Sequence, residues 1–131
     1  SEEDHSTTAD AVSLSARRIT EVLECRFAVA YTNTGSTARR LARDRPYAPI
    51  LAATPNVEVA QSLSLCWGVT AKVTEDISDF GEMIARADTL ASEAGGENGE
   101  RIVILSGFPF GRSGKTNTLK ISRIGAIEDD S

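Results

Sequence analysis

A strand, a loop and a helix follow one another in Phe27-Ala-Val-Ala-Tyr-Thr-Asn-Thr-Gly-Ser-Thr-Ala-Arg39. The first five residues form an apolar run of strand length, and the next five are polar and turn-like. Residues 37–43 predict a helix, which ends near Arg45-Pro46 because the residue before a proline disfavours the α region. A buried strand that leads directly into a helix is typical of an α/β sheet.

The same alternation continues on both sides of this stretch. We expect further helices over residues 8–24, 54–67 and 78–93, and further strands over residues 49–53, 69–73, 101–105 and 116–124. Strands separated by helices need crossover connections, so the first four strands should be parallel, with helices on both faces. The fifth follows without a helix and should run antiparallel. The predicted fold is a three-layer α/β/α sandwich whose five-stranded mixed sheet has four parallel strands and one antiparallel edge strand.

Length and composition indicate one globular domain. The chain has 131 residues, of which 40% are hydrophobic and 25% charged. Its net charge of −5 comes mostly from six acidic residues at the two ends, so the folded body is nearly neutral, which argues against bulk binding to nucleic acid or membrane surfaces. No apolar run approaches the roughly 20 residues of a membrane span. We expect a disordered acidic tail over 1–7, a domain over 8–124, an acidic tail over 125–131 and a cytoplasmic location.

Catalytic and metal-binding groups are scarce. Cys25 and Cys66 form no C-x-x-C motif and are expected to be reduced thiols, while the only histidine is His5 in the acidic tail. Neither a zinc site nor a histidine general base is therefore predicted in the body. Asp76 and Asp79 stand near a strand end, where such a pair usually caps a helix. These observations predict a binding or regulatory domain that is not catalytic by itself.

The first loop, Thr32–Thr37, is the strongest candidate for a ligand site. Ligands of open parallel sheets bind beyond the carboxyl ends of the strands, and this loop begins at such an end. It supplies four hydroxyls, Gly35 lets the backbone approach a ligand, and the following helix N-terminus favours an anion. An ordinary helix cap by Ser36 or Thr34 explains the same residues, so both interpretations stay open.

A second loop, Ser106–Lys115, should lie at the same edge of the sheet. Arg112 and Lys115 place two cations between its glycines, which suits a phosphorylated ligand, although a solvated hairpin loop has the same composition. Its ending Gly-Lys-Thr116 is similar to that of a P-loop, but a strand is predicted to follow. A P-loop must open a helix, so nucleotide hydrolysis of that kind is excluded.

Three further groups of side chains stand out in the sequence. Arg39, Arg40, Arg43 and Arg45 crowd one short helix and form either its solvated face or a contact with a partner domain. Cys66 and Trp67 close an apolar helix and are expected to pack in the core. Phe108 and Phe110 flank a proline in an exposed loop, where they are either a lid, an interface or simple surface residues.

Taken together, the motifs resemble the C-terminal domain of pyruvate kinase. They occur in that family's order and spacing from about residue 8 to residue 124. The matching segments are Thr32-Asn-Thr-Gly-Ser-Thr-Ala-Arg39, Arg45-Pro46, Ala48-Pro-Ile50, Thr54-Pro-Asn56, Leu65-Cys-Trp-Gly-Val69, Ile104-Leu-Ser-Gly-Phe-Pro109 and Gly114-Lys-Thr-Asn-Thr-Leu-Lys-Ile121.

The resemblance implies a regulatory domain of a glycolytic enzyme. Phosphoenolpyruvate, nucleotide, Mg²⁺ and K⁺ bind in the family's barrel domain, so no cofactor is expected in this chain. The resemblance implies an allosteric site for fructose 1,6-bisphosphate, ribose 5-phosphate or AMP, and contacts with the barrel domain and with other C-domains in a tetramer. It places the ligand on Thr32, Asn33, Thr34, Gly35, Ser36 and Thr37, with Arg112, Ser113, Gly114 and Lys115 from the second loop.

One departure leaves the ligand's identity open. In the animal and yeast enzymes, a tryptophan and an arginine before the fourth strand grip a second phosphate, and residues 95–100 offer neither here. Two other functions remain as alternatives: a ligand-free structural module that mediates subunit contacts, and a phosphatase-like hydrolase that uses Ser36 or Thr37.

Overall fold

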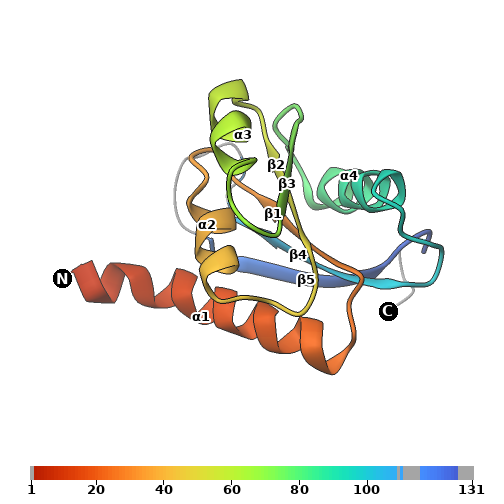
Figure 1. Ribbon diagram of the computed structural model, residues 1–131, viewed down its shortest axis with the longest axis horizontal. Helices are drawn as coiled ribbons and strands as arrows, with labels where there is room; N and C mark the ends of the chain where they lie inside the picture. The colour runs from red at the N-terminus through yellow and green to blue at the C-terminus, as the bar shows by residue number, and fades with distance from the viewer. Residues whose placement is uncertain (1, 109, 111–115, 127–131) are drawn as a thin grey trace.

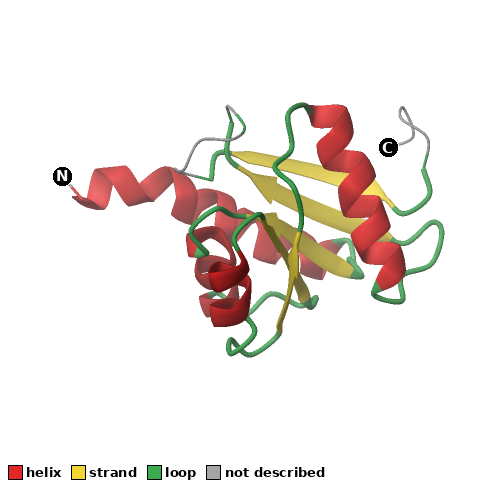
Figure 2. Cartoon of the chain, turned by 90° about the horizontal axis from the view of Figure 1, so that it is seen from above, coloured by secondary structure: helices red, strands yellow, loops and turns green. Residues whose placement is uncertain are grey.

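The computed structural model describes residues 2–108, 110 and 116–126. These residues form four helices and five strands in the predicted order, and the helices cover both faces of a single sheet (Figures 1 and 2). The elements are α1 (Glu2–Val22), β1 (Phe27–Tyr31), α2 (Ser36–Arg43), β2 (Ile50–Thr54), α3 (Val57–Leu63), β3 (Val69–Val73), α4 (Phe80–Glu93), β4 (Arg101–Ser106) and β5 (Thr118–Arg123).

The sheet has the strand order β3-β2-β1-β4-β5. Strands β1 to β4 pair in parallel, and β5 pairs antiparallel with β4 at the edge, which confirms the predicted mixed sheet. The three inner strands β1, β2 and β4 are almost entirely buried, whereas the edge strands β3 and β5 are partly exposed. Burial on both faces explains why the inner strands are continuous apolar runs in the sequence.

The core is divided by the sheet into two clusters. Successive side chains of a strand point to opposite faces, so Val29 and Tyr31 of β1 face α4, whereas Ala28 and Ala30 face the other three helices. Helix α4 covers one face alone, and α1, α2 and α3 share the other (Figure 2). Both layers of helices are thus anchored on the same five residues of β1.

The direction of winding changes at β1. The helices α2 and α3 carry the chain from β1 to β2 and then to β3 across one face. Helix α4 then crosses the opposite face and places β4 on the other side of β1. The carboxyl ends of β1 and β4 consequently lie side by side while their connections diverge, and such a switch point is where open α/β sheets bind ligands.

Helix α1 begins earlier than the sequence predicts. It starts at Glu2 rather than at residue 8. Residues 2–10 contain neither glycine nor proline, so no strong helix breaker interrupts this stretch. The first turns of α1 project beyond the sheet (Figure 1). The tail over 127–131 lies outside the described residues.

Helix α3 ends earlier than predicted, and this corrects the prediction that Trp67 packs in the core. The helix stops at Leu63, which occupies the last buried position, and the chain then turns through Gly68 at a φ of 81°. Because the helical periodicity is broken at that point, Trp67 is turned outward and is 80% exposed. Apolar spacing alone could not show where the helix would end.

The arginines of α2 hold this helix to its neighbours. Arg40 forms an ion pair with Asp10 of α1 at 2.8 Å, and Arg39 donates to the Ser62 hydroxyl of α3 at 2.6 Å. The Arg45 guanidinium lies over the Trp67 ring, 5.0 Å from its centroid. Arg39 and Arg40 are therefore more than a solvated face, because they link α2 to both adjacent helices.

Both cysteines are free thiols, as the sequence predicts. Cys25 is buried, and this burial raises the pKa of its thiol. Cys66 is half-buried beside the Arg39 guanidinium, which donates to its Sγ at 3.6 Å. Among the helices in the described part of the chain, none is both long and apolar enough to span a bilayer.

Candidate functional site

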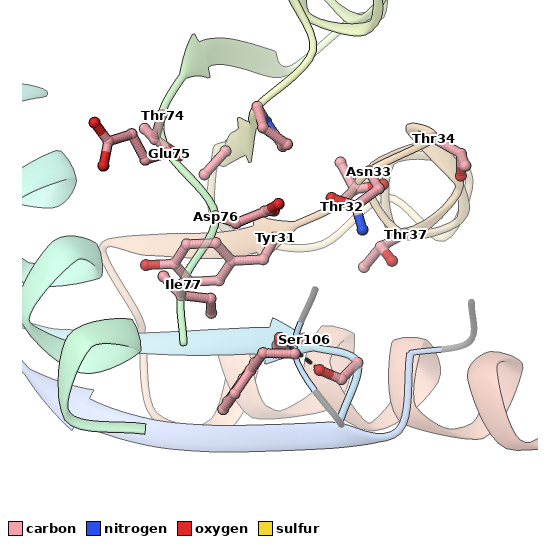
Figure 3. A pocket seen from close by; sticks show the side chains of 14 residues that line it. Tyr31, Thr32, Asn33, Thr34, Thr37, Thr74, Glu75, Asp76, Ile77 and Ser106 are labelled. Atoms are coloured by element: carbon pink, nitrogen blue, oxygen red, sulfur yellow. Dashed lines mark hydrogen bonds between the residues drawn. The ribbon is translucent and has the colours of Figure 1, made fainter. Parts of the chain in front are cut away.

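A pocket opens at the switch point, beyond the carboxyl ends of β1, β2, β3 and β4 (Figure 3). Its cavity volume is about 50 Å³, so it is a shallow site that lies open to solvent. Six of its fourteen lining residues have short polar side chains that donate and accept hydrogen bonds, namely Thr32, Asn33, Thr34, Thr37, Thr74 and Ser106. A surface of this kind suits a small, highly polar ligand.

The first loop forms one wall of the pocket. Gly35 is held at a φ of 95°, a conformation that residues with a Cβ rarely adopt, and a Cβ there would stand 3.4 Å from both Arg39 and Val59. The Gly35 N–H donates to Thr32 Oγ1 at 2.7 Å, which closes the turn. The loop therefore needs glycine, and it leads directly into α2.

The start of α2 is capped only in part. Its N-cap residue is Gly35, which has no side chain to accept the first N–H groups, and Thr34 Oγ1 accepts only the Ser36 N–H, at 3.3 Å. By comparison, α3 and α4 are capped by the side chains of Asn56 and Asp79. Asp79 therefore caps α4, as predicted. In the first loop, helix capping by a side chain accounts only for the hydrogen bond between Thr34 and the Ser36 N–H.

The second loop meets the first, as the predicted topology requires. Thr37 Oγ1 and Thr116 Oγ1 lie 2.5 Å apart and form a buried hydrogen bond between residues 79 positions apart in the chain. Gly107 and Phe110 of the second loop line the pocket. The predicted ligand residues Arg112, Ser113, Gly114 and Lys115 lie outside the described residues.

Several pocket residues have no clear signal in the sequence. Tyr31 donates its hydroxyl to the Met83 carbonyl at 2.8 Å, and burial raises the pKa of this phenol, so the hydroxyl stays protonated and fixes the floor of the pocket. The loop after β3 supplies Glu75 and Asp76. The sequence paired Asp76 with Asp79 as helix caps, but only Asp79 caps α4, and Asp76 lines the pocket. In Figure 3 the Asp76 carboxylate points toward Thr32 and Asn33, whereas Glu75 points away from them.

The described lining offers groups that can bind a ligand. Among the described lining residues, the charged side chains are both acidic, and no histidine is present to act as a general base. The part of the chain that the structure describes contains no cluster of three potential metal ligands. Hydroxyls, a glycine turn and a helix N-terminus can hold an anion, but they offer no activated nucleophile.

The family model and the sequence relatives that match this chain all belong to the same family. Residues 10–122 match the family model described as pyruvate kinase, alpha/beta domain. A pyruvate kinase of Methylorubrum extorquens is 44% identical over 117 residues, which are 88% of this chain and 24% of the relative. A pyruvate kinase of Lactococcus lactis is 36% identical over 122 residues, or 92% of this chain and 24% of the relative.

The solved structures agree with the sequence relatives. A crystal structure of a pyruvate kinase from Cryptosporidium parvum superposes with a TM-score of 0.79 and 30% identity, covering 89% of this chain and 23% of that one. The chain thus spans about a quarter of the length of the proteins it matches. On its sequence and its fold, the chain belongs to the family of pyruvate kinase C-terminal alpha/beta domains.

Proposed function

We propose that this domain is the regulatory part of a pyruvate kinase and that its pocket binds a phosphorylated small molecule. The observation that carries the proposal is the place of the first loop: a hydroxyl-rich turn and the glycine-capped N-terminus of α2 stand at the switch point of the sheet. Phosphoryl transfer, with the Mg²⁺ and K⁺ that serve it, is assigned to the rest of the enzyme. Arg112 and Lys115 remain predicted contributors.

Physical chemistry supports a phosphate at this loop. Free N–H groups at a helix start and the helix dipole both stabilise an anion, within about the first turn of the helix. The hydroxyls of Thr32, Thr34 and Thr37 are close enough to line the same cavity and can donate to phosphate oxygens. The expectation drawn from the family resemblance, that a phosphate lies on the same residues, supports the proposal.

Calorimetric titration of the isolated chain tests this proposal. We expect saturable binding of at least one of fructose 1,6-bisphosphate, ribose 5-phosphate, glucose 6-phosphate and AMP, with a Kd of roughly 1 mM or tighter. Unphosphorylated fructose and adenosine serve as matched controls and should give no saturable heat. Silence from all four phosphorylated compounds would overturn the proposal.

A second candidate function is contact between subunits or with the rest of the enzyme, and it is supported by exposed apolar side chains. Tyr47, Leu65 and Trp67 are 68%, 88% and 80% exposed, which is a large apolar surface for one small domain. If contact is the only function, light scattering should show a mass that depends on protein concentration and is unchanged by any of the four phosphorylated compounds. A ligand-dependent mass would exclude the ligand-free module.

A further inference from the structure

A second cavity opens at the edge of the sheet opposite the pocket at the switch point. It lies before the amino ends of β2 and β3, between the segment that links α2 to β2 and the segment that links α3 to β3. Its volume is about 180 Å³, far more than the roughly 10–15 Å³ that one water molecule needs. Ile50 lines this cavity and Ala53 lines the other, so the two sites lie at opposite ends of β2.

The lining is mostly apolar and includes two aromatic side chains that are largely exposed. Tyr47 and Trp67 line the cavity together with Ala42, Pro46 and Ile50. Aromatic side chains usually bury most of their large apolar surface when nothing else needs it. Sites for small molecules typically combine apolar and aromatic side chains with a small number of polar groups. The composition of this cavity is therefore that of a small-molecule site.

Among the described residues that line the cavity, Arg45 is the one with a charged side chain. Its guanidinium lies over the Trp67 ring, 5.0 Å from the centroid, so stacking orients the group while its N–H edges can still donate. The neighbouring Asp44 carboxylate is turned toward α1, where it accepts the Ser13 hydroxyl at 2.8 Å. The ion pairs formed by the described residues do not include Arg45, so its charge is available to an anion.

The backbone is strained at the residue that carries this charge. Arg45 has a φ of 55°, in the left-handed region that residues with a Cβ rarely adopt. A glycine would adopt this conformation without cost, and the arginine does not. Strain of this kind persists only where the surroundings hold it, and it is concentrated at functional sites such as ligand sites. The conformation places the guanidinium over Trp67, at the wall of the cavity.

The two segments that form the cavity are held in place by backbone hydrogen bonds. The Tyr47 N–H donates to Thr20 Oγ1 of α1 at 3.1 Å. The Ile50 N–H donates to the Gly68 carbonyl at 2.9 Å, which joins the two segments directly beside Trp67. The aromatic side chains thus extend from anchored backbone, and such preorganisation lowers the entropic cost of binding.

We propose that this cavity is a second ligand site, which takes a small aromatic carboxylate. The ring lies against Tyr47, Trp67 and the apolar lining, and the carboxylate accepts hydrogen bonds from the Arg45 guanidinium. Charge complementarity selects an anion, because the planar fork of an arginine matches the two oxygens of a carboxylate. Contacts between aromatic rings favour a planar ring over a saturated one. The site is separate from the proposed phosphate site and does not depend on it.

The fluorescence of Trp67 tests this proposal directly, because it is the only tryptophan in the sequence. The 131-residue chain is titrated with benzoate, with benzamide, which lacks the charge, and with cyclohexanecarboxylate, which lacks the aromatic ring. We expect benzoate to change the Trp67 emission saturably, with a Kd of roughly 10 mM or tighter for a ligand of this size. Benzamide should bind about 5-fold more weakly, and cyclohexanecarboxylate roughly 2- to 13-fold more weakly.

Two matched variants test the role of the charge. Arg45→Gln removes the charge and keeps a polar side chain, so benzoate should bind no more tightly than benzamide does, and the affinity for benzamide should be unchanged. Arg43→Gln makes the same exchange on α2, outside the cavity lining, and should leave every affinity unchanged. Thermal unfolding followed by circular dichroism checks that each variant is folded.

The outcomes that contradict the proposal are distinct from those that bear on the phosphate site. Equal affinities for benzoate and benzamide, or equal losses in the Arg45 and Arg43 variants, would overturn it. The absence of a saturable response to benzoate would overturn it as well. If the Trp67 emission then shifts with protein concentration, a second copy of the chain covers the cavity instead. Thr34→Glu, which alters the pocket at the switch point, should leave benzoate binding unchanged, so the proposed function stands or falls separately.

Discussion

Replacing Thr34 with glutamate is expected to weaken the binding of every phosphorylated ligand by roughly 5- to 900-fold. Thr34 stands in the turn before α2 and lines the pocket. A carboxylate there would face the phosphate at contact distance, where repulsion between two unit charges costs about 1–4 kcal/mol near a protein surface, and that range converts to the fold-change given. Calorimetric titration with the tightest ligand of the unmodified chain measures the effect.

Two variants separate charge from other consequences of the Thr34 substitution. Thr34→Val has nearly the shape of threonine without the hydroxyl, and its loss should be limited to about one hydrogen bond, roughly 1 kcal/mol or 5-fold. Thr89→Glu makes the same exchange at an exposed position of α4 and should leave the affinity unchanged. A Thr34→Glu variant that binds within twofold of the unmodified chain would show that the phosphate does not lie on this loop.

Replacing Leu41 with alanine is expected to lower the free energy of unfolding by about 2–5 kcal/mol. Leu41 lies on the inner side of α2 and is 0% exposed, within the cluster that joins α1, α2 and α3 to the sheet. Its loss removes apolar contact and leaves a cavity that a close-packed interior fills only in part. A total stability of about 5–15 kcal/mol would be reduced substantially, which urea denaturation followed by circular dichroism can measure.

The matched control is Leu14→Ala, which makes the same exchange on α1 at a side chain that is 56% exposed. Leucine and alanine are both good helix formers, so helix propensity changes little in either variant. The control should lose less than about 1 kcal/mol, since most substitutions at exposed positions have small effects. Equal losses in the two variants would contradict the packing of α2 on the sheet described here.

The types of the elements and their order were predictable from local patterns. Runs such as Phe27–Tyr31 and residues 101–105 have the length and apolar character of buried strands, and the Gly95-Gly96 pair marks the end of the helix that Asp79 caps. The antiparallel direction of β5 was predictable, because the sequence shows no helix between it and the preceding strand. These features depend on interactions between residues close in the chain, which local spacing and composition reflect.

The prediction of where α3 ends was wrong, because contacts between residues far apart in the chain overrule the helical spacing of apolar residues. The spacing of apolar residues continues through α3 to Trp67, but the helix stops at Leu63, because the chain must turn there to bring Val69 beside Ile50 on the adjacent strand. The ring of Trp67 is then left outside, under Arg45. No local pattern encodes the position of a neighbouring strand.

The first loop was recognisable from sequence, because a turn glycine, hydroxyls and a helix start are contiguous in Thr32–Thr37. The pocket around this loop was not recognisable from sequence, because its other walls come from strands whose order in the sheet no local pattern reveals. The tertiary structure sets β4 and β1 side by side and brings Asp76 and Phe80 to the same edge as the first loop. Strand order depends on which helix crosses which face of the sheet, and only the packing of the whole chain determines that.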